Sequence, residues 1–250
     1  MRVLKIGGNE LNDPGFLPLL AGWVAKTVRA GESIVIVHGG GSDIAVMQAR
    51  LGLEPKKVDG LRVTDAESLS VAQMVLSGHT NKQIVTALLL AGVDAVGLSG
   101  VDGRLLTARK KNHPAVDLGL VGEIERVRAD LLHNLSAQGI TAVISPISLG
   151  QDGTIYNVNA DEAASAIALA LQADLLDFIS NVPGVLHQGQ VITQLTAAQT
   201  EDLIHQGVIN GGMVPKVRGA LTAVSQGVPR ARIVNLAGLL QAGGTIFMEA

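Results

Sequence analysis

Short β-branched runs alternate with amphipathic helical segments along almost the whole chain of 250 residues. The run "SIVIVHGGG" (33–41) has the continuous apolar character of a parallel strand that is buried on both faces. Further strands are predicted at 2–6, 95–100, 140–147, 174–180 and 230–235, with a possible edge strand at 244–249. Helices are predicted at 16–30, 42–52, 65–78, 80–92, 128–139, 160–173, 196–207 and 212–227. This alternation predicts an α/β fold with a mainly parallel sheet covered on both faces.

Composition supports a large core and excludes several classes of chemistry. Hydrophobic residues make up 47% of the chain and aromatic residues only 2%, so aliphatic side chains must build the core. The absence of cysteine excludes disulfides, thiolate zinc sites and cysteine nucleophiles. A net charge of −3 without a long basic run argues against a nucleic-acid partner. No apolar run reaches about 18 residues, so we expect no membrane span and a cytoplasmic protein.

No long linker divides the chain, so we expect one domain with two lobes that share a continuous sheet. The polar stretch 101–127 predicts a short hairpin. Within it, the basic segment "ARKKNH" (108–113) is interpreted as a solvated loop.

Three glycine clusters fall at predicted strand ends, where parallel sheets bind ligands: Gly7-Gly8, Gly39-Gly40-Gly41 and Gly97 with Gly100. Lys5 directly precedes the first cluster, and a helix predicted to be capped by Ser42 follows the second. Each cluster alone is explained by a tight turn. Together they favour an anion site in which backbone N–H groups converge, although the chain contains neither G-x-x-x-x-G-K-[ST] nor G-x-G-x-x-G.

Four further polar residues are candidates for the same site. Lys216 lies in the first turns of a helix that glycines precede, where a cation gains nothing from the helix dipole. It is either a solvated surface residue or a cation with an anionic partner. Asp161 follows a predicted cap at Asn159 or Ala160, and it either stabilises the helix start or holds ammonium groups. Arg62 is either an exposed loop residue or a bidentate carboxylate ligand, and Asn157 offers both a donor and an acceptor. His38 is interpreted as a structural hydrogen-bonding residue, because no histidine has metal-ligand spacing.

These segments together, in this order, resemble the acetylglutamate kinases of the amino acid kinase family. The resemblance covers almost the whole chain, and "VDGLRVTD", "NVNAD" and "GGMVPKV" are its most specific parts. The matching segments are "KIGGN" (5–9), "VHGGGSDI" (37–44), "VDGLRVTD" (58–65), "NKQIV" (81–85), "VGLSGVDG" (96–103), "NVNADEAASAIA" (157–168), "SNVPGVL" (180–186) and "GVINGGMVPKV" (207–217).

The resemblance implies a fold and a reaction. The fold is a three-layer αβα sandwich around a mostly parallel sheet of about eight strands. A single domain 1–250 would comprise an N-lobe (about 1–155) that binds the acyl amino acid and dimerises, and a C-lobe (156–250) that binds ATP. The reaction is transfer of the γ-phosphoryl group of ATP to the γ-carboxylate of N-acetyl-L-glutamate in arginine biosynthesis, with Mg²⁺ held mainly by the ATP phosphates.

The resemblance also implies roles for individual residues. Lys5 and Lys216 would stabilise the transferring phosphoryl group, Asp161 would organise both lysines, and Gly8 and Gly40 would offer backbone N–H groups. Substrate binding would fall to Gly40, Gly41, Arg62 and Asn157. Nucleotide binding would fall to Ser180, Asn181, Val182, Gly184, Val185, Leu186, Asn210, Gly211, Gly212 and Met213.

The chain departs from the family pattern at Ser42, where proline is frequent, and at Asn181, where aspartate is common. The segment 235–250 is also shorter than usual and lacks a histidine-bearing pattern. Family members that form arginine-inhibited hexamers carry an additional N-terminal helix, and this chain begins at its first strand, so we expect a homodimer without arginine feedback.

Three other functions remain alternatives. The first is a kinase for a related acyl amino acid, such as succinylglutamate or carrier-linked aminoadipate or glutamate. The second is a catalytically silent nucleotide-binding regulatory protein, against which the combination of Lys5, Asp161 and Lys216 argues. The third, a dinucleotide-dependent dehydrogenase, is disfavoured by the missing G-x-G-x-x-G motif.

Overall fold

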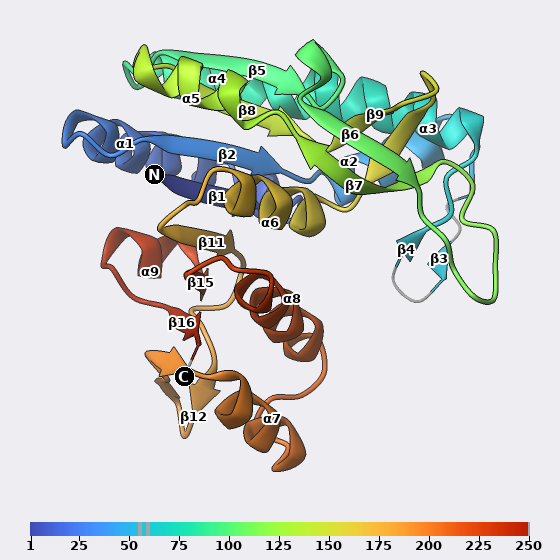
Figure 1. Ribbon diagram of the computed structural model, residues 1–250. Helices are drawn as coiled ribbons and strands as arrows, with labels where there is room; N and C mark the ends of the chain where they lie inside the picture. Colours follow the sequence, from blue (N-terminus) through green and yellow to red (C-terminus); the bar gives the residue numbers. More distant parts are fainter. Residues whose placement is uncertain (55–56, 59–60, 250) are drawn as a thin grey trace.

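The computed structural model describes residues 1–54, 57–58 and 61–249, with the side chains of 57–58 and 61–62 left out of the description. An eight-stranded sheet runs through the molecule in the order β14-β16-β15-β11-β1-β2-β8-β5 (Figure 1). Its strands are β1 (Arg2–Ile6), β2 (Ile34–His38), β5 (Ala95–Ser99), β8 (Thr141–Ser145), β11 (Leu175–Ile179), β14 (Gln194–Leu195), β15 (Arg230–Val234) and β16 (Thr245–Met248). Neighbouring strands are parallel except for the antiparallel pair β15 and β16.

Helices cover both faces of this sheet, because successive side chains of each strand point to opposite sides. One face packs against α1 (Phe16–Arg29), α4 (Asn81–Leu90) and α9 (Leu236–Leu240). The other face packs against α5 (Ala129–Ala137), α6 (Ala160–Ala170) and α8 (Met213–Ser225), and α7 (Ala197–His205) lies beside α8. The three-layer αβα fold with a mostly parallel sheet of eight strands is therefore confirmed.

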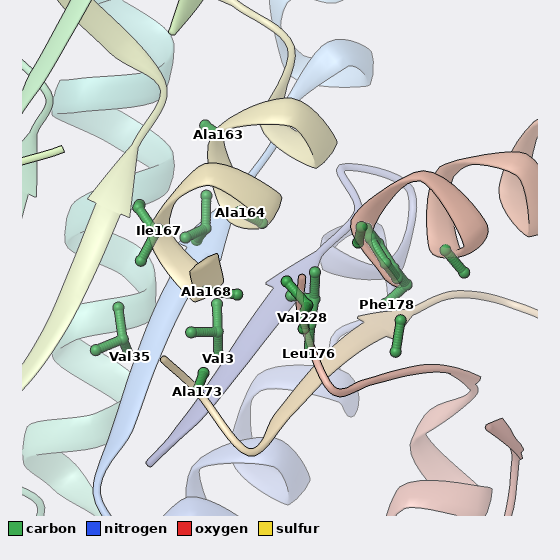
Figure 2. Packing of buried hydrophobic residues seen from close by; sticks show 14 of the residues in the cluster. Val3, Val35, Ala163, Ala164, Ile167, Ala168, Ala173, Leu176, Phe178 and Val228 are labelled. Atoms are coloured by element: carbon green, nitrogen blue, oxygen red, sulfur yellow. The ribbon is translucent and has the colours of Figure 1, made fainter. Parts of the chain in front are cut away.

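Helix α6 lies directly on the centre of the sheet. Its residues Ala163, Ala164, Ile167 and Ala168 are fully buried in one cluster with Val3 of β1 and Val35 of β2, and Figure 2 shows Ile167 and Ala168 on the side of these valines. Alanine side chains let the helix axis come close to the sheet. This packing fixes the N-terminal turn of α6 at the carboxyl ends of the strands, where ligands bind in parallel sheets.

A second, smaller sheet stands beside the first and closes on itself. It contains β6 (Leu106–Lys110), β7 (Val121–Val127), β9 (Ile147–Gly150) and β10 (Ile155–Val158). The antiparallel pair β6 and β7 confirms the predicted hairpin. The interpretation of "ARKKNH" as a loop is wrong for its first half, because Ala108, Arg109 and Lys110 pair with β7.

The remaining elements are short or lie at the edges of the two sheets. They are α2 (Gly41–Arg50), α3 (Ala66–Gln73), the one-turn helices η1 (Glu10–Asn12) and η3 (Asp102–Arg104), and the short strands β3 (Lys57–Val58), β4 (Leu61–Arg62), β12 (Leu186–His187) and β13 (Gln190–Val191). Within the described ranges, no helix combines the length and apolarity needed to cross a membrane.

Three local predictions differ from the structure. The two helices predicted at 65–78 and 80–92 form one helical run from α3 to α4 through a π-helical turn η2 (Met74–Thr80), because helix dihedrals continue through Gly78 and its neighbours. The segment 244–249 is not an edge strand, since β14 pairs outside it. Ser42 does not cap α2: the cap is Gly40, and the Ser42 hydroxyl donates instead to the Gly8 carbonyl at 3.1 Å.

Candidate active site

The carboxyl ends of β1, β2 and β11 meet the N-terminal turns of α2, α6 and α8 around two adjoining cavities. The larger cavity has a volume of about 530 Å³ and the smaller one about 250 Å³. Both cavities are lined by Lys5, Gly8, Gly41 and Asp161, so these residues form the boundary between them. A ligand in each cavity could therefore meet the other at this boundary.

Lys5 and Asp161 form an ion pair at the boundary. Lys5 lies two residues beyond Val3 on the α6 side of the sheet, and its Nζ is 2.8 Å from Oδ1 of Asp161 in the first turn of α6. Asn159 caps that helix by accepting the Asp161 backbone N–H at 2.7 Å, as the sequence predicts. The Lys5 side chain is only 16% exposed, so the ammonium is held in one place by packing and by charge.

The glycines of the first two clusters allow backbones to touch. A Cβ at Gly8 would lie 2.8 Å from the Gly41 nitrogen, and one at Gly40 would lie 2.7 Å from Leu76 Cδ2. Gly8 is required for the close approach of two backbones, whereas the neighbour of Gly40 is the end of the Leu76 side chain. Neither glycine has a left-handed conformation, so positive φ is not the reason for either. The two loops are thereby brought together at the N-terminus of α2, where N–H groups favour an anion.

The third glycine cluster has a structural role. A Cβ at Gly97 would lie 1.9 Å from Asn81 Oδ1, and one at Gly100 would lie 2.7 Å from the Ile147 carbonyl oxygen. Neither glycine lines either cavity. The expectation that all three clusters build one anion site is therefore wrong for this one.

Lys216 enters the larger cavity from the first turn of α8. Its ammonium donates to the Ser180 hydroxyl at 2.5 Å and to Asn181 Oδ1 at 3.1 Å. Burial lowers the pKa of Lys216, and Lys5 acts in the same direction, whereas Glu10 and Asp161 raise that pKa. Asp161 acts on the two lysines in different ways: it forms an ion pair with Lys5, and it acts on Lys216 through its charge at longer range.

The smaller cavity contains most of the predicted acceptor residues. Gly40, Gly41 and Asn157 line it, and the Asn157 amide donates to the Thr64 hydroxyl at 3.3 Å. Thr64 is itself anchored, since its backbone nitrogen donates to the Leu118 carbonyl at 3.0 Å. The side chain of Arg62 lies outside the described part of the chain, so its predicted role stays a prediction.

The predicted nucleotide residues are divided by the structure. Ser180 and Asn181 line the larger cavity. Val185 is buried and its backbone nitrogen donates to the Thr245 hydroxyl at 2.8 Å. The other predicted residues, which line neither cavity, are Val182, Gly184, Leu186, Asn210, Gly211, Gly212 and Met213. Residues 210–213 lead into α8, the helix that carries Lys216.

Two charged residues of the cavities were missed by sequence reasoning. Glu10 lines the larger cavity, and a Cβ at Gly7 would lie 2.1 Å from Glu10 Oε2, so Gly7 makes room for this carboxylate. Lys111 lines the smaller cavity and forms an ion pair with Glu162. The signal for Glu10 was its place just after "KIGGN", whereas Lys111 is brought in by the β6–β7 pairing alone.

His38 is buried at the end of β2 and has hydrogen-bonding partners for both ring nitrogens. Asn81 donates to Nε2 at 3.2 Å, which leaves Nδ1 as the donor to the Gly39 carbonyl at 2.9 Å. Burial lowers the pKa of His38 to about 4, so the ring is neutral at physiological pH. The prediction of a structural hydrogen-bonding histidine is confirmed.

Comparison with known proteins identifies the family of this chain. The sequence model described as the amino acid kinase family matches residues 1–235. The chain belongs to the amino acid kinase family. Its curated relatives include the acetylglutamate kinase of Roseiflexus castenholzii, which is 52% identical over 99% of this chain and 94% of that protein. The acetylglutamate kinase of Methanopyrus kandleri is 44% identical over 98% and 99% of the two chains.

The fold has a counterpart among solved structures. The carbamate kinase of Giardia superposes with a TM-score of 0.71 over 100% of this chain and 98% of that chain, at 15% identity. At that identity the likeness supports the fold alone. The family membership inferred from "VDGLRVTD", "NVNAD" and "GGMVPKV" is confirmed by the full-length relatives.

Proposed function

We propose that this member of the amino acid kinase family transfers the γ-phosphoryl group of ATP to the γ-carboxylate of N-acetyl-L-glutamate, a step of arginine biosynthesis. The observation that carries this proposal is the boundary between the two cavities, where the Lys5–Asp161 pair lies and which Lys216 approaches from the larger side. Full-length relatives at about 50% identity that are named acetylglutamate kinases support the choice of acceptor.

The residues match what this transfer needs. A carboxylate is already ionised at neutral pH, so the nucleophile needs no general base. The histidine nearest the glycine loops, His38, is neutral and occupied by hydrogen bonds, which agrees with a reaction without a histidine base. The two anionic reactants must be aligned and their charge must be neutralised. Positive charge is supplied here by Lys5, by Lys216 and by the N–H groups at the start of α2.

Each cavity fits one reactant. ATP would occupy the larger cavity, with its terminal phosphate at Lys5 and Lys216 and with Ser180 and Asn181 of the C-lobe (156–250) beside it. On the family resemblance, residues 182–186 and 210–213 would bind the part of the nucleotide that extends beyond the cavity. N-acetyl-L-glutamate would occupy the smaller cavity, against Gly40, Gly41 and Asn157 of the N-lobe (1–155), together with Arg62. In-line transfer would then cross the boundary at Gly8.

Magnesium ion fits the larger cavity as a partner of the nucleotide. Glu10 and Asp161 line it, and Mg²⁺ is usually bound by one or two carboxylates together with substrate phosphates. In the described ranges, no group of three or more His, Asp or Glu side chains is placed to hold a metal alone. The ion would neutralise phosphate charge. We further propose a cytoplasmic homodimer, on the family resemblance.

A coupled assay of ADP release tests the proposed function. The purified protein, with ATP and Mg²⁺, is given N-acetyl-L-glutamate, N-succinyl-L-glutamate, L-glutamate or carbamate in separate reactions. We expect turnover with N-acetyl-L-glutamate to exceed the others, because the smaller cavity has a volume of only about 250 Å³ and is lined by Gly40, Gly41 and Asn157, the residues expected to bind that acceptor. Faster turnover of N-succinyl-L-glutamate would show that this compound, and not N-acetyl-L-glutamate, is the acceptor. Nucleotide binding without turnover of any acceptor would indicate a regulatory protein.

A further inference from the structure

Lys111 is a charged residue that lines the smaller cavity and has no role in the proposed function. It follows β6, and its backbone nitrogen donates to the Val121 carbonyl at 2.8 Å, which extends the β6–β7 pairing. Its side chain is 20% exposed and lines the cavity together with Asn157 and the glycines of the second cluster. A lysine on an open strand would normally extend its ammonium into solvent, so this partial burial requires a cause.

The cause is an ion pair with Glu162 in the first turn of α6. The neighbouring residue Asp161 pairs with Lys5 at 2.8 Å. Consecutive carboxylates of one helical turn thus hold two lysines that line the same cavity. Glu162 does not itself line the cavity, so it anchors the Lys111 ammonium from behind. An ammonium has three N–H donors, and one contact with Glu162 leaves it able to bind a ligand.

The chemistry of a dicarboxylate acceptor requires such a group. Among the described residues that line the smaller cavity, the cationic side chains are Lys5 and Lys111. Lys5 lies at the boundary where the phosphoryl group would be transferred, so it serves the reacting carboxylate. The second carboxylate of the acceptor would still be desolvated on binding, and a buried carboxylate needs a charged or hydrogen-bonding partner.

We propose that Lys111 is a specificity-determining residue that binds the carboxylate of the acceptor that is not phosphorylated. Glu162 is the positioning residue that holds the Lys111 ammonium over the cavity. The proposal rests on the proposed function. It gives the acceptor a second cationic ligand, Lys111, in addition to Arg62. It makes the enzyme selective for dicarboxylates over acyl amino acids that have only the reacting carboxylate.

The test compares two ligands and two neighbouring lysines. Lys111→Gln and Lys110→Gln are each titrated by calorimetry with N-acetyl-L-glutamate and with 4-acetamidobutanoate, which lacks the α-carboxylate. Lys110 is a matched control, because it is 49% exposed, pairs with Asp117 at 2.8 Å and lines neither cavity. ATP affinity and the thermal unfolding midpoint are measured for each variant, and Lys111→Arg serves as a charge-conserving variant.

We expect Lys111→Gln to weaken N-acetyl-L-glutamate binding by about 10- to 100-fold, the usual range for a hydrogen bond to a charged group. Binding of 4-acetamidobutanoate and of ATP should change by no more than about twofold, and Lys110→Gln should match the wild type for all three ligands. Lys111→Arg should retain most of the selectivity for the dicarboxylate. Glu162→Gln should weaken acceptor binding less than Lys111→Gln does.

Two results would overturn the assignment: an equal loss for both acceptors, which indicates a structural role, or unchanged binding of N-acetyl-L-glutamate. If Lys111→Gln does not fold, the assignment of Lys111 is overturned when the folded Lys111→Arg variant has lost the preference for the dicarboxylate. The wild-type titration separates these outcomes from failure of the proposed function. If the wild type neither binds nor phosphorylates N-acetyl-L-glutamate, the function fails, and if it does both, only the role of Lys111 is in question.

Discussion

The lysines of the two cavities are held by different kinds of partner. On the side of the smaller cavity, Lys5 and Lys111 are paired with the carboxylates Asp161 and Glu162. On the side of the larger cavity, Lys216 donates to a hydroxyl and an amide oxygen, those of Ser180 and Asn181. All three ammonium groups are oriented, but among the described residues it is the first two, Lys5 and Lys111, that have a directly bound counter-charge.

This difference matches the charge of the proposed ligands. A lysine with a bound carboxylate still has N–H donors for a ligand but carries less net charge, which suits a dicarboxylate acceptor that is less charged than ATP. Lys216 keeps its charge uncompensated at contact distance, so it attracts a polyanion more strongly. Burial, and to a smaller extent the nearby Lys5, lower the pKa of Lys216 because they disfavour its protonated form. Asn181 accepts from Lys216 through a neutral amide oxygen, so this contact leaves the charge of Lys216 uncompensated.

The largest expected effect is the removal of either phosphate-facing lysine. Lys5→Ala and Lys216→Ala should each lower kcat by roughly 10²- to 10³-fold or more, the scale of losing one preorganised charge in the transition state. Steady-state kinetics with both substrates measures this. Near-normal turnover in either variant would refute its assigned role. Lys26→Ala, on an outer helix and away from both cavities, is the control.

Removal of the partner of Lys5 should lower kcat more than removal of a partner of Lys216. Asp161→Asn removes the charge that holds Lys5, so kcat should fall by about 10- to 100-fold, in the range of a charge-assisted hydrogen bond. Asn181→Ala removes only a neutral acceptor from Lys216, and we expect a loss below about tenfold. The same kinetic assay compares the variants. A larger decrease in kcat for Asn181→Ala than for Asp161→Asn would contradict the view that the charged partner contributes more than the neutral one.

The smallest effect concerns the pH dependence of Lys216. Its lowered pKa means that its ammonium loses a proton, and kcat declines, at a lower pH than for an exposed lysine. The Glu10 carboxylate raises this pKa, so Glu10→Gln should lower it further and move the alkaline decline of kcat to lower pH. A pH–kcat profile measures the shift, with Glu67→Gln, exposed and outside both cavities, as the control. An unchanged pH–kcat profile would show that Glu10 does not influence the pKa of Lys216.

Much of the fold follows from local pattern. The run at 33–41 predicted β2 because β-branched residues fill a parallel strand that is buried on both faces. The break predicted near Gly78 failed, because a glycine is tolerated inside a helix when flanking turns pack, and here a π turn carries the helix through. The place of β16 inside the sheet could not be predicted, since pairing with the two-residue β14 has almost no sequence signal.

The sequence by itself determined most of the longer strands and helices, the Lys5–glycine strand end, the capped start of α6 and several of the residues at the site. These features depend on neighbours within a few positions, where periodicity, capping and close-approach glycines act. Only the tertiary structure decided that Lys5 pairs with Asp161, that Lys216 pairs with Ser180 and Asn181, and that Lys111 lines the smaller cavity. These contacts join segments far apart in the chain, and the packing of α6 and α8 on a shared sheet fixes their distances.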